Sequence, residues 1–226
     1  MNSRTIQLLG KENFEKIANS KIAVFGLGGV GGTCFEALVR SGISKFYIQD
    51  FDEVNESNLN RQILFNLNDV GQKKCSSAVI FAKNINKNVE IIANDNKLTR
   101  DFSLEFLKDY DFVVDAIDDI DAKIYLLSFC VKNNIKVISS LGMGKKLDPS
   151  KVHICKLNKT TMDPLAKKLR YLLKKEEIEI SNIYCAFTDE IPSNSCDNNI
   201  ISSMIFVPSS AGLNMAHFII KTLLDN

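Results

Sequence analysis

The sequence lacks several patterns that would place a protein in a class at once. Its six cysteines form no C-x-x-C pair, which excludes the usual structural zinc site and a thioredoxin-like motif. No apolar run approaches the length of a membrane span, no signal peptide precedes the first predicted strand, and there is no internal repeat or low-complexity tract. The 226 residues therefore predict one large cytoplasmic domain with reduced cysteines and no membrane partner.

Charge and histidine content are equally uninformative. The formal net charge is +1, so only a local basic patch could attract a polyanion. The two histidines, His153 and His217, fall in a predicted strand and on an apolar helix, and we predict a packing role for both. Function must therefore be sought in local motifs.

The clearest local pattern is a strand followed by a glycine-rich turn and a helix. Residues 22–25 are a short apolar run, typical of a strand buried on both faces, and helical spacing of apolar residues resumes from Cys34 to Val39. Between them stand Gly26, Gly28, Gly29, Gly31 and Gly32. Such a turn presents backbone N–H groups and a helix N-terminus to a phosphate, and glycine permits the close approach of the ligand. The pattern predicts phosphate or nucleotide binding.

The rest of the chain alternates between strand-like and helix-like segments. Strands are predicted over residues 45–50, 89–93, 111–116 and 135–140. Helices are predicted over residues 6–18, from Gly71 to Ile85, and over 102–107 and 122–131. This alternation is typical of an α/β fold with a doubly wound, mostly parallel, Rossmann-like sheet, which binds its ligand outside the carboxyl ends of the strands.

The pattern changes after residue 140. A strand is predicted over residues 152–156, a basic amphipathic helix over 164–175 and an apolar helix over 211–224. Two weaker strand patterns, at 180–188 and 200–206, flank a polar loop at 189–199. We interpret this part as a partner or substrate layer rather than an independent domain.

Polar and charged side chains gather at one predicted edge of the sheet. Asp50 ends the second strand about twenty residues after the glycines, where a carboxylate can accept hydrogen bonds from ribose hydroxyls. The others follow the same strands along the chain: Asn58, Arg61, Gln62, Lys74 and Asp118. Two cations and an amide suit the triphosphate of ATP better than the pyrophosphate of a dinucleotide, and a carboxylate can hold magnesium between phosphate oxygens.

Taken together, the motifs G-x-G-G-x-G, D-x-D, N-x-x-R-Q, G-x-x-K and V-V-D-A-x-D resemble the adenylating domain shared by ubiquitin-activating enzymes and the bacterial proteins MoeB and ThiF. In this chain they are carried by Gly26–Gly31, Asp50 and Asp52, Asn58 with Arg61 and Gln62, Gly71 with Lys74, and Asp115 with Asp118. The resemblance implies that a carboxylate attacks the α-phosphate of ATP and pyrophosphate leaves. It also implies a single adenylating domain over residues 1–226, with an ATP-binding core at 1–140 and a substrate and dimer-contact region at 141–226.

The resemblance assigns roles by position. The implied ATP-binding residues are Gly26, Gly28, Gly29, Gly31, Asp50, Asp52, Asn58, Arg61, Gln62 and Lys74. Among them Asp50 would hold the ribose, while Arg61 and Lys74 would neutralise the triphosphate; Asp118 would bind magnesium. Arg4 matches an arginine that in this family reaches into the neighbouring subunit's site, which implies a homodimer in which Arg4 shares the catalytic role of Arg61, Lys74 and Asp118.

The segment from Leu141 to Lys175 is similar to the corresponding segment of the tRNA threonylcarbamoyladenosine dehydratases, a branch of the HesA/MoeB/ThiF family. The shared landmarks are Asp148-Pro149, Lys156-Leu157, Thr160-Thr161, Asp163-Pro164-Leu165 and the basic helix. The implied reaction adenylates the threonyl carboxylate of the modified adenosine in tRNA, and internal attack then releases AMP and closes a ring, a net dehydration. The implied contacts with tRNA phosphates are Lys167, Lys168, Arg170, Lys174 and Lys175.

Three other functions remain open from the residues alone. The first is adenylation of the C-terminal carboxylate of a ubiquitin-like sulfur-carrier protein, with a possible sulfur-transfer partner. The second is a nucleotide-dependent dehydrogenase, and the third a non-catalytic adenine-nucleotide-binding protein. Because the stretch from Phe206 to Leu213 lacks the cysteine that some family members have there, no thiol role is predicted for Cys185 or Cys196.

Overall fold

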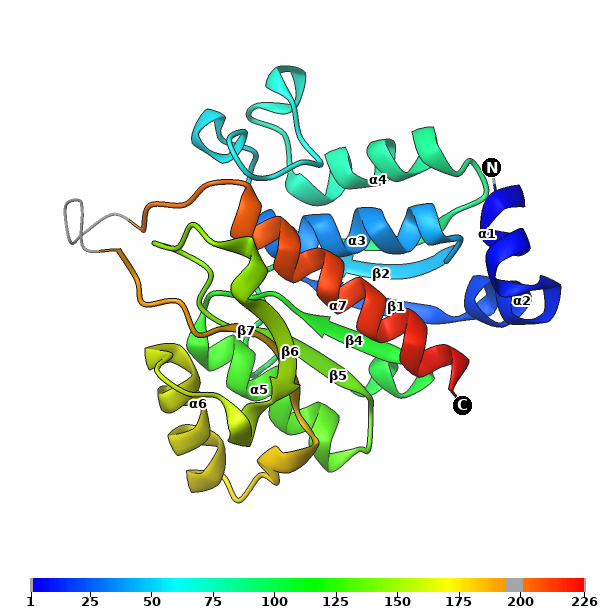
Figure 1. Cartoon of the computed structure of the whole chain (residues 1–226). Coiled ribbons are helices and arrows are strands. Elements are labelled where there is room, and N and C mark those ends of the chain that lie inside the picture. Colours follow the sequence, from blue (N-terminus) through cyan, green and yellow to red (C-terminus); the bar gives the residue numbers. More distant parts are fainter. Residues whose placement is uncertain (1, 194–200, 226) are drawn as a thin grey trace.

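The computed structural model describes residues 2–193 and 201–225, and these form a single sheet covered by helices on both faces (Figure 1). The sheet has seven strands in the order β3-β2-β1-β4-β5-β7-β6. Their bounds are β1 Lys21–Phe25, β2 Lys45–Gln49, β3 Glu90–Asn94, β4 Phe112–Asp115, β5 Val137–Ser140, β6 Val152–Lys156 and β7 Tyr184–Thr188. All pairs are parallel except β6 with β7, which is antiparallel. The predicted doubly wound, mostly parallel α/β fold is confirmed.

The helices divide between the two faces of the sheet. Their bounds are α1 Ser3–Leu9, α2 Lys11–Asn19, α3 Gly29–Ser41, α4 Lys74–Ile85, α5 Ile120–Lys132, α6 Pro164–Lys175 and α7 Phe206–Leu224. One core lies between the sheet and the helices α3, α4 and α7; the other lies beneath α5 and α6. The central strand serves both, because Ile22 and Val24 face the first core whereas Ala23 and Phe25 face the second.

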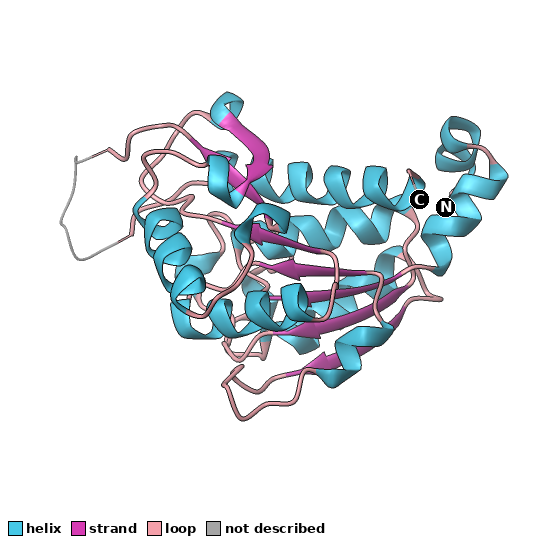
Figure 2. Cartoon of the chain, turned by 90° about the horizontal axis from the view of Figure 1, so that it is seen from below, coloured by secondary structure: helices cyan, strands magenta, loops and turns pink. Residues whose placement is uncertain are grey.

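The strand order places a crevice at the carboxyl end of β1. The chain leaves β1 through α3 to β2 on one side, and later returns to the other side of β1 as β4. This reversal is the point where an open α/β sheet binds its ligand. Both termini of the described chain lie at the opposite end of the strands (Figure 2).

Residues after 140 extend the same sheet rather than forming a second body. β7 pairs with β5 in parallel, and α7 returns across the sheet to pack along α3. The interpretation of this part as a partner or substrate layer stays a prediction. The boundary at residue 140 and the roles assigned to its two sides stay predictions.

Several predicted elements differ from the structure. The helix predicted over 6–18 is two helices, because Gly10 interrupts it with φ 81°. The helix predicted to begin at Gly71 begins at Lys74, since residues 71–73 form a turn against the loop after β2. The helix at 102–107 is a 3₁₀ segment over Glu105–Asp109, and the strand predicted at 180–188 begins only at Tyr184.

The largest error concerns the strand predicted at 200–206. The described residues do not include residue 200, much of the predicted loop at 189–199, or Cys196. Residues 201–205 are described and join no strand. Phe206 already begins α7, five residues before the predicted start at Ala211. Pro208 concealed this start, although proline is tolerated in the first helical turn, where its missing N–H has no intrahelical partner. No helix in the described residues is long and apolar enough to span a bilayer.

Candidate nucleotide-binding site

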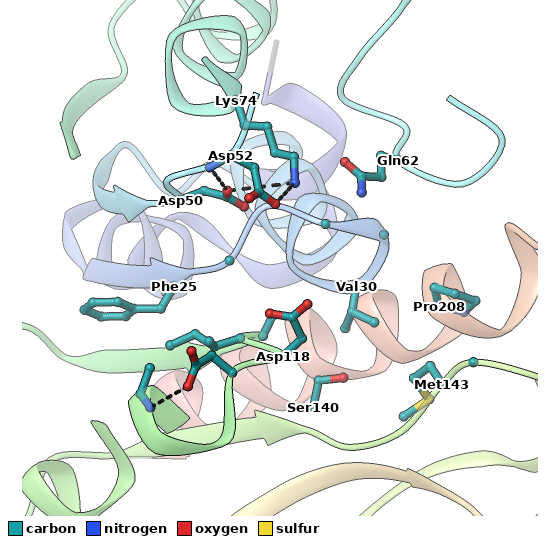
Figure 3. Close-up of a pocket in the computed structure, with 18 of the residues that line it drawn as sticks. Phe25, Val30, Asp50, Asp52, Gln62, Lys74, Asp118, Ser140, Met143 and Pro208 are labelled. Carbon is teal, nitrogen blue, oxygen red and sulfur yellow. Dashed lines mark hydrogen bonds and ion pairs between the residues drawn. The ribbon is translucent and has the colours of Figure 1, made fainter. Parts of the chain in front are cut away.

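A cavity of about 650 Å³ lies at the carboxyl edge of the sheet, over the ends of β1, β2 and β4. Its lining includes nine of the ten predicted ATP-binding residues together with Asp118 (Figure 3). The tenth, Gly31, does not line it. The structure therefore brings together residues that the sequence spreads over almost a hundred positions.

The glycine turn forms the floor of this cavity. Gly26 has φ 88°, and a Cβ there would lie 2.5 Å from the carbonyl oxygen of Ala116, so only glycine fits. Gly31 supports the turn from behind, because a Cβ would collide with the carbonyl of Gly26 and with the side chain of Ala116. The structure thus shows a close-packing role for Gly31, and its contact with a nucleotide stays a prediction. Gly28 and Gly29 remain at the cavity surface, where α3 begins.

Asp50 fastens the glycine turn to the end of β2. Its Oδ2 atom accepts a hydrogen bond from the Leu27 N–H at 2.6 Å, and its Oδ1 atom accepts one from the Asp52 N–H at 3.0 Å. Burial raises the pKa of the Asp50 carboxyl, against the opposing effects of Lys74 and the two N–H donors. Each carboxylate oxygen keeps a further lone pair that can accept a hydrogen bond from a ribose hydroxyl. The ribose contact itself stays a prediction. The structure adds an organising role that the sequence did not suggest.

Lys74 points from the first residue of α4 toward the same carboxylates. Its Nζ atom lies 2.7 Å from Oδ2 of Asp52 and 3.8 Å from Oδ1 of Asp50. The lysine is buried, whereas the Asp52 side chain remains half exposed. A buried ammonium at the cavity wall is well placed to meet an anionic ligand, because its attraction is poorly screened by water.

The loop after β2 forms another wall. The Oδ1 atom of Asn58 accepts a hydrogen bond from the Asn55 N–H at 3.1 Å, which shapes the loop. The Arg61 guanidinium donates to the Ser57 carbonyl at 3.0 Å and to the Asn60 side chain at 2.9 Å. Gln62 is 95% buried, and its Oε1 atom has no hydrogen-bond partner among the described residues. A buried, unpaired amide oxygen beside a cavity indicates a site built to receive a further donor.

Asp118 enters from the loop after β4. Figure 3 shows its carboxylate directed toward the glycine turn, from the side opposite to Asp50 and Lys74. Its neighbour Asp119 caps α5 by accepting from Asp121 and Ala122, and pairs with Lys97 at 2.8 Å. No group of three or more His, Cys, Asp or Glu side chains in the described chain is arranged to hold a metal ion. A cation here would therefore rely on Asp118 and on ligand oxygens.

The sequence matches the ThiF family over residues 2–225. This chain belongs to the ThiF family. It is 38% identical to the tRNA threonylcarbamoyladenosine dehydratase of Bacillus subtilis, over 99% of this chain and 94% of that protein, and 33% identical to the one from Escherichia coli, over 82% and 72%. Crystal structures of the E. coli enzyme with ATP and with AMP each superpose with a TM-score of 0.92 at 29% identity, covering 98% of this chain and 93% of theirs.

Beneath the cavity, this ThiF-family chain contains a buried ion pair that the sequence did not reveal. The Nζ atom of Lys123 lies 2.7 Å from Oδ2 of Asp115, and neither side chain is exposed. Lys123 also donates to the Ser139 hydroxyl at 3.1 Å and to the Ser140 carbonyl at 3.0 Å. The pair joins the carboxyl ends of β4 and β5. Only the placement of a lysine on the inner face of α5 could have signalled it.

Two groups of predicted residues lie away from the cavity. Arg4 is exposed on α1, at the far end of the strands, and takes no part in its own chain's cavity (Figure 1). The predicted tRNA contacts lie on α6, where the four lysines are exposed. Arg170 differs from them, because its guanidinium donates to the carbonyl and the hydroxyl of Thr160 and holds α6 to the preceding loop.

The ThiF-family cavity also has a wall that the site predictions did not include. It is formed by residues of the second half of the chain and by the loop after β3: Asn96, Lys97, Leu98, Ser140, Leu141, Gly142, Met143, Gly144, Leu165, Ile201, Ser203 and Pro208. Apolar side chains dominate this wall, in contrast to the charged groups around Lys74. No motif marked these residues, because they meet only through the fold.

Proposed function

We propose that this protein is an ATP-dependent tRNA threonylcarbamoyladenosine dehydratase that adenylates the threonyl carboxylate of the modified adenosine. The observation that carries the proposal is the convergence of Arg61, Lys74 and Asp118 on the glycine turn in one cavity. The B. subtilis and E. coli relatives bear the name of this activity, and the E. coli enzyme binds ATP and AMP.

Charge placement accounts for the first step. The glycine turn and the N-terminus of α3 offer N–H groups to phosphate oxygens, while Lys74 and Arg61 neutralise the negative charge that builds up as pyrophosphate departs. The threonyl carboxylate attacks the α-phosphorus, the bond to the bridging oxygen breaks, and pyrophosphate leaves with that electron pair. The product is a mixed anhydride between the threonyl group and AMP.

The second step needs no thiol of the protein. A nucleophile of the same modified adenosine attacks the activated acyl carbon, loses its proton to solvent and expels AMP, so that the ring closes with the net loss of one water. Burial raises the pKa of Cys34 and Cys130, and raises that of Cys75 to about 12, which leaves these thiols protonated at neutral pH. Cys34, Cys75 and Cys130 thus fit a structural role in a reducing cytoplasm.

Magnesium belongs to the proposal as the ion that would accompany the triphosphate, held by Asp118. The fit rests on the exposed Asp118 carboxylate, which faces the glycine turn, and on magnesium's preference for one or two carboxylates plus phosphate oxygens. When bound, the ion would offset phosphate charge. Asp118 would orient it from the side opposite to Lys74.

A homodimer is the second part of the proposal. Arg4 belongs to α1, which lies at the opposite end of the strands from the cavity, so its implied catalytic role requires a partner subunit. Mixing inactive Arg4→Ala and Lys74→Ala proteins should restore activity, because a mixed dimer contains one site with both residues intact. No recovery after subunit exchange would contradict the shared site.

The direct test of function is mass analysis of the RNA. tRNA that carries threonylcarbamoyladenosine is incubated with the protein, ATP and magnesium, and we expect the modified nucleoside to lose one water. A carrier protein with a Gly-Gly terminus serves as the rival substrate. Adenylation of the carrier without change in the tRNA would replace this function by sulfur-carrier activation, and ATP-independent hydride transfer would exclude both.

A further inference from the structure

Helix α6 is joined at its first turn to the wall of the nucleotide cavity. The Asp163 side chain caps the helix by accepting from the Ala166 N–H at 2.9 Å, and it also accepts from the Gly142 N–H at 3.2 Å. Lys146 strengthens the joint by donating to the Gly142 carbonyl at 2.7 Å. Gly142 and Leu165 both line the cavity. The helix therefore starts at the cavity and leads away from it.

The outer face of α6 carries one aromatic ring among four cations. Ala166, Leu169 and Leu173 are buried against the sheet side, whereas the Tyr171 side chain is 68% exposed. Lysines stand three and four residues before and after Tyr171, at positions 167, 168, 174 and 175. Residues at these spacings are neighbours on a helix surface, so the ring lies between two pairs of ammonium groups.

The cations on this face are not neutralised by ion pairs among residues 2–193 and 201–225. None of these four lysines forms an ion pair with an acidic side chain in the described part of the chain. The nearby Glu176 is already paired with Arg100 at 2.7 Å and accepts from Ser128 at 3.0 Å. Residues 141–175 contain ten Lys and Arg but only two Asp, although the whole chain has a net charge of +1.

An exposed tyrosine surrounded by lysines matches the chemistry of single-stranded RNA. Unpaired bases stack on aromatic rings, and the phosphates on either side of the base meet cations. A double helix hides its base faces and offers nothing to such a ring. From Leu165 at the cavity to Lys175 the helix rises about 15 Å, enough for a few nucleotides beside the one that enters the cavity.

We propose that Tyr171 is a stacking platform for an unpaired base next to the modified adenosine, with Lys167, Lys168, Lys174 and Lys175 holding the flanking phosphates. The inference rests on the proposed tRNA substrate and adds the residue that binds the loop rather than the reacting group. Arg170 has no part in this surface, because it is bound to Thr160. Tyr171 touches no reacting atom and acts on affinity for the RNA.

The test compares Tyr171→Ala with Tyr171→Phe on tRNA that carries threonylcarbamoyladenosine. The alanine variant should raise the KM for tRNA about tenfold, with kcat and the KM for ATP unchanged, since the loss of stacking on one base weakens binding by about five- to 150-fold. The phenylalanine variant keeps the ring and should behave like wild type. Lys83→Gln, an exposed lysine on α4, is the control for loss of a remote surface group.

Salt dependence separates the ring from the cations. The double variant K167Q/K168Q should reduce the slope of log KM against log salt by about one per lost phosphate contact, whereas Tyr171→Ala should leave the slope unchanged. An unchanged KM for tRNA in Tyr171→Ala overturns the inference, as does an equal rise in the KM for ATP, which would indicate a structural effect.

A binding measurement keeps this inference distinct from the proposed function. The dissociation constant for an unmodified anticodon stem-loop is measured for wild type and Tyr171→Ala. If wild type fails to dehydrate tRNA but Tyr171→Ala still weakens stem-loop binding tenfold, the function fails and the RNA surface stands. If wild type dehydrates tRNA and the two proteins bind the stem-loop equally, the surface fails and the function stands.

Discussion

The ammonium group of Lys74 lies 2.7 Å from the Asp52 carboxylate and 3.8 Å from that of Asp50. The cation is thus held in place by two anions before any nucleotide arrives. The Asp52 side chain is half exposed, whereas the Lys74 side chain is buried. The ion pairs neutralise the buried ammonium charge of Lys74 and still leave this group available to the ligand.

Replacement of Lys74 by alanine should lower adenylation by about two to four orders of magnitude, because the charge that opposes the departing pyrophosphate is lost. The measurement is tRNA-dependent exchange between ATP and pyrophosphate. Lys73→Ala is the matched control, since Lys73 is exposed and pairs with Glu53 at 3.0 Å. Equal activity in the two variants would remove Lys74 from the site.

Asp118→Asn should shift the magnesium titration of the exchange reaction to higher concentration. An amide lacks the charge of the carboxylate and binds the hard cation more weakly. Asp121→Asn provides the comparison, because Asp121 is an exposed carboxylate three residues along the chain that does not line the cavity. Superimposable titrations for wild type and Asp118→Asn would argue against the metal assignment.

Lys123→Met should destabilise the fold by about 3–5 kcal/mol, since it leaves the Asp115 carboxylate buried without its partner. For a chain of this length the loss lowers Tm by roughly 6–20 °C, which calorimetry measures. Lys132→Met, at the exposed end of the same helix, should change Tm little. Replacing both partners, as in K123M/D115L, should recover part of the loss; a Tm for Lys123→Met equal to wild type would mean the pair adds no stability.

Cys155 should react with iodoacetamide before Cys34, Cys75 and Cys130. The neighbouring Cys185 thiol lowers the pKa of Cys155, whereas burial raises the pKa of the other three. A lower pKa gives more reactive thiolate at a given pH, so labelling of Cys155 should already be substantial below about pH 8.5, the ordinary range of a free thiol. Peptide mass analysis after brief labelling ranks these cysteines, with Cys155→Ser as control. Earlier labelling of Cys34 would indicate that the core opens.

The sequence predicted the parts of the fold that depend on local pattern. The apolar run of β1 and the glycines that follow it define the crevice, and the spacing from Asp50 to Asp118 placed both carboxylates at its edge. Parallel strands make this possible, because the residue after each strand reaches the same edge of the sheet. The spacing of these residues alone left four functions open, and the family resemblance then favoured one of them, adenylation of a carboxylate in tRNA.

The remaining features arise from contacts between distant segments, which no local pattern records. Lys123 stands on a helix whose composition gave no sign that its ammonium group is enclosed by β4 and β5. Pro208 lies before the helix predicted over 211–224, yet it stands in the first turn of α7 and at the cavity wall. Tyr171 belongs to no motif, and its exposure became visible only when the structure showed which side of α6 is covered.

The hydroxyls of Thr33 and Ser209 are 3.3 Å apart, although 176 positions separate them in the chain. The first turn of α7 thus supports the start of α3, whose N-terminus lies at the cavity. Contacts between such remote segments require a long loop to close, and their closure costs conformational entropy. ATP should therefore bind only to protein molecules in which α7 has packed against α3. Nucleotide binding then reports that the whole chain has folded.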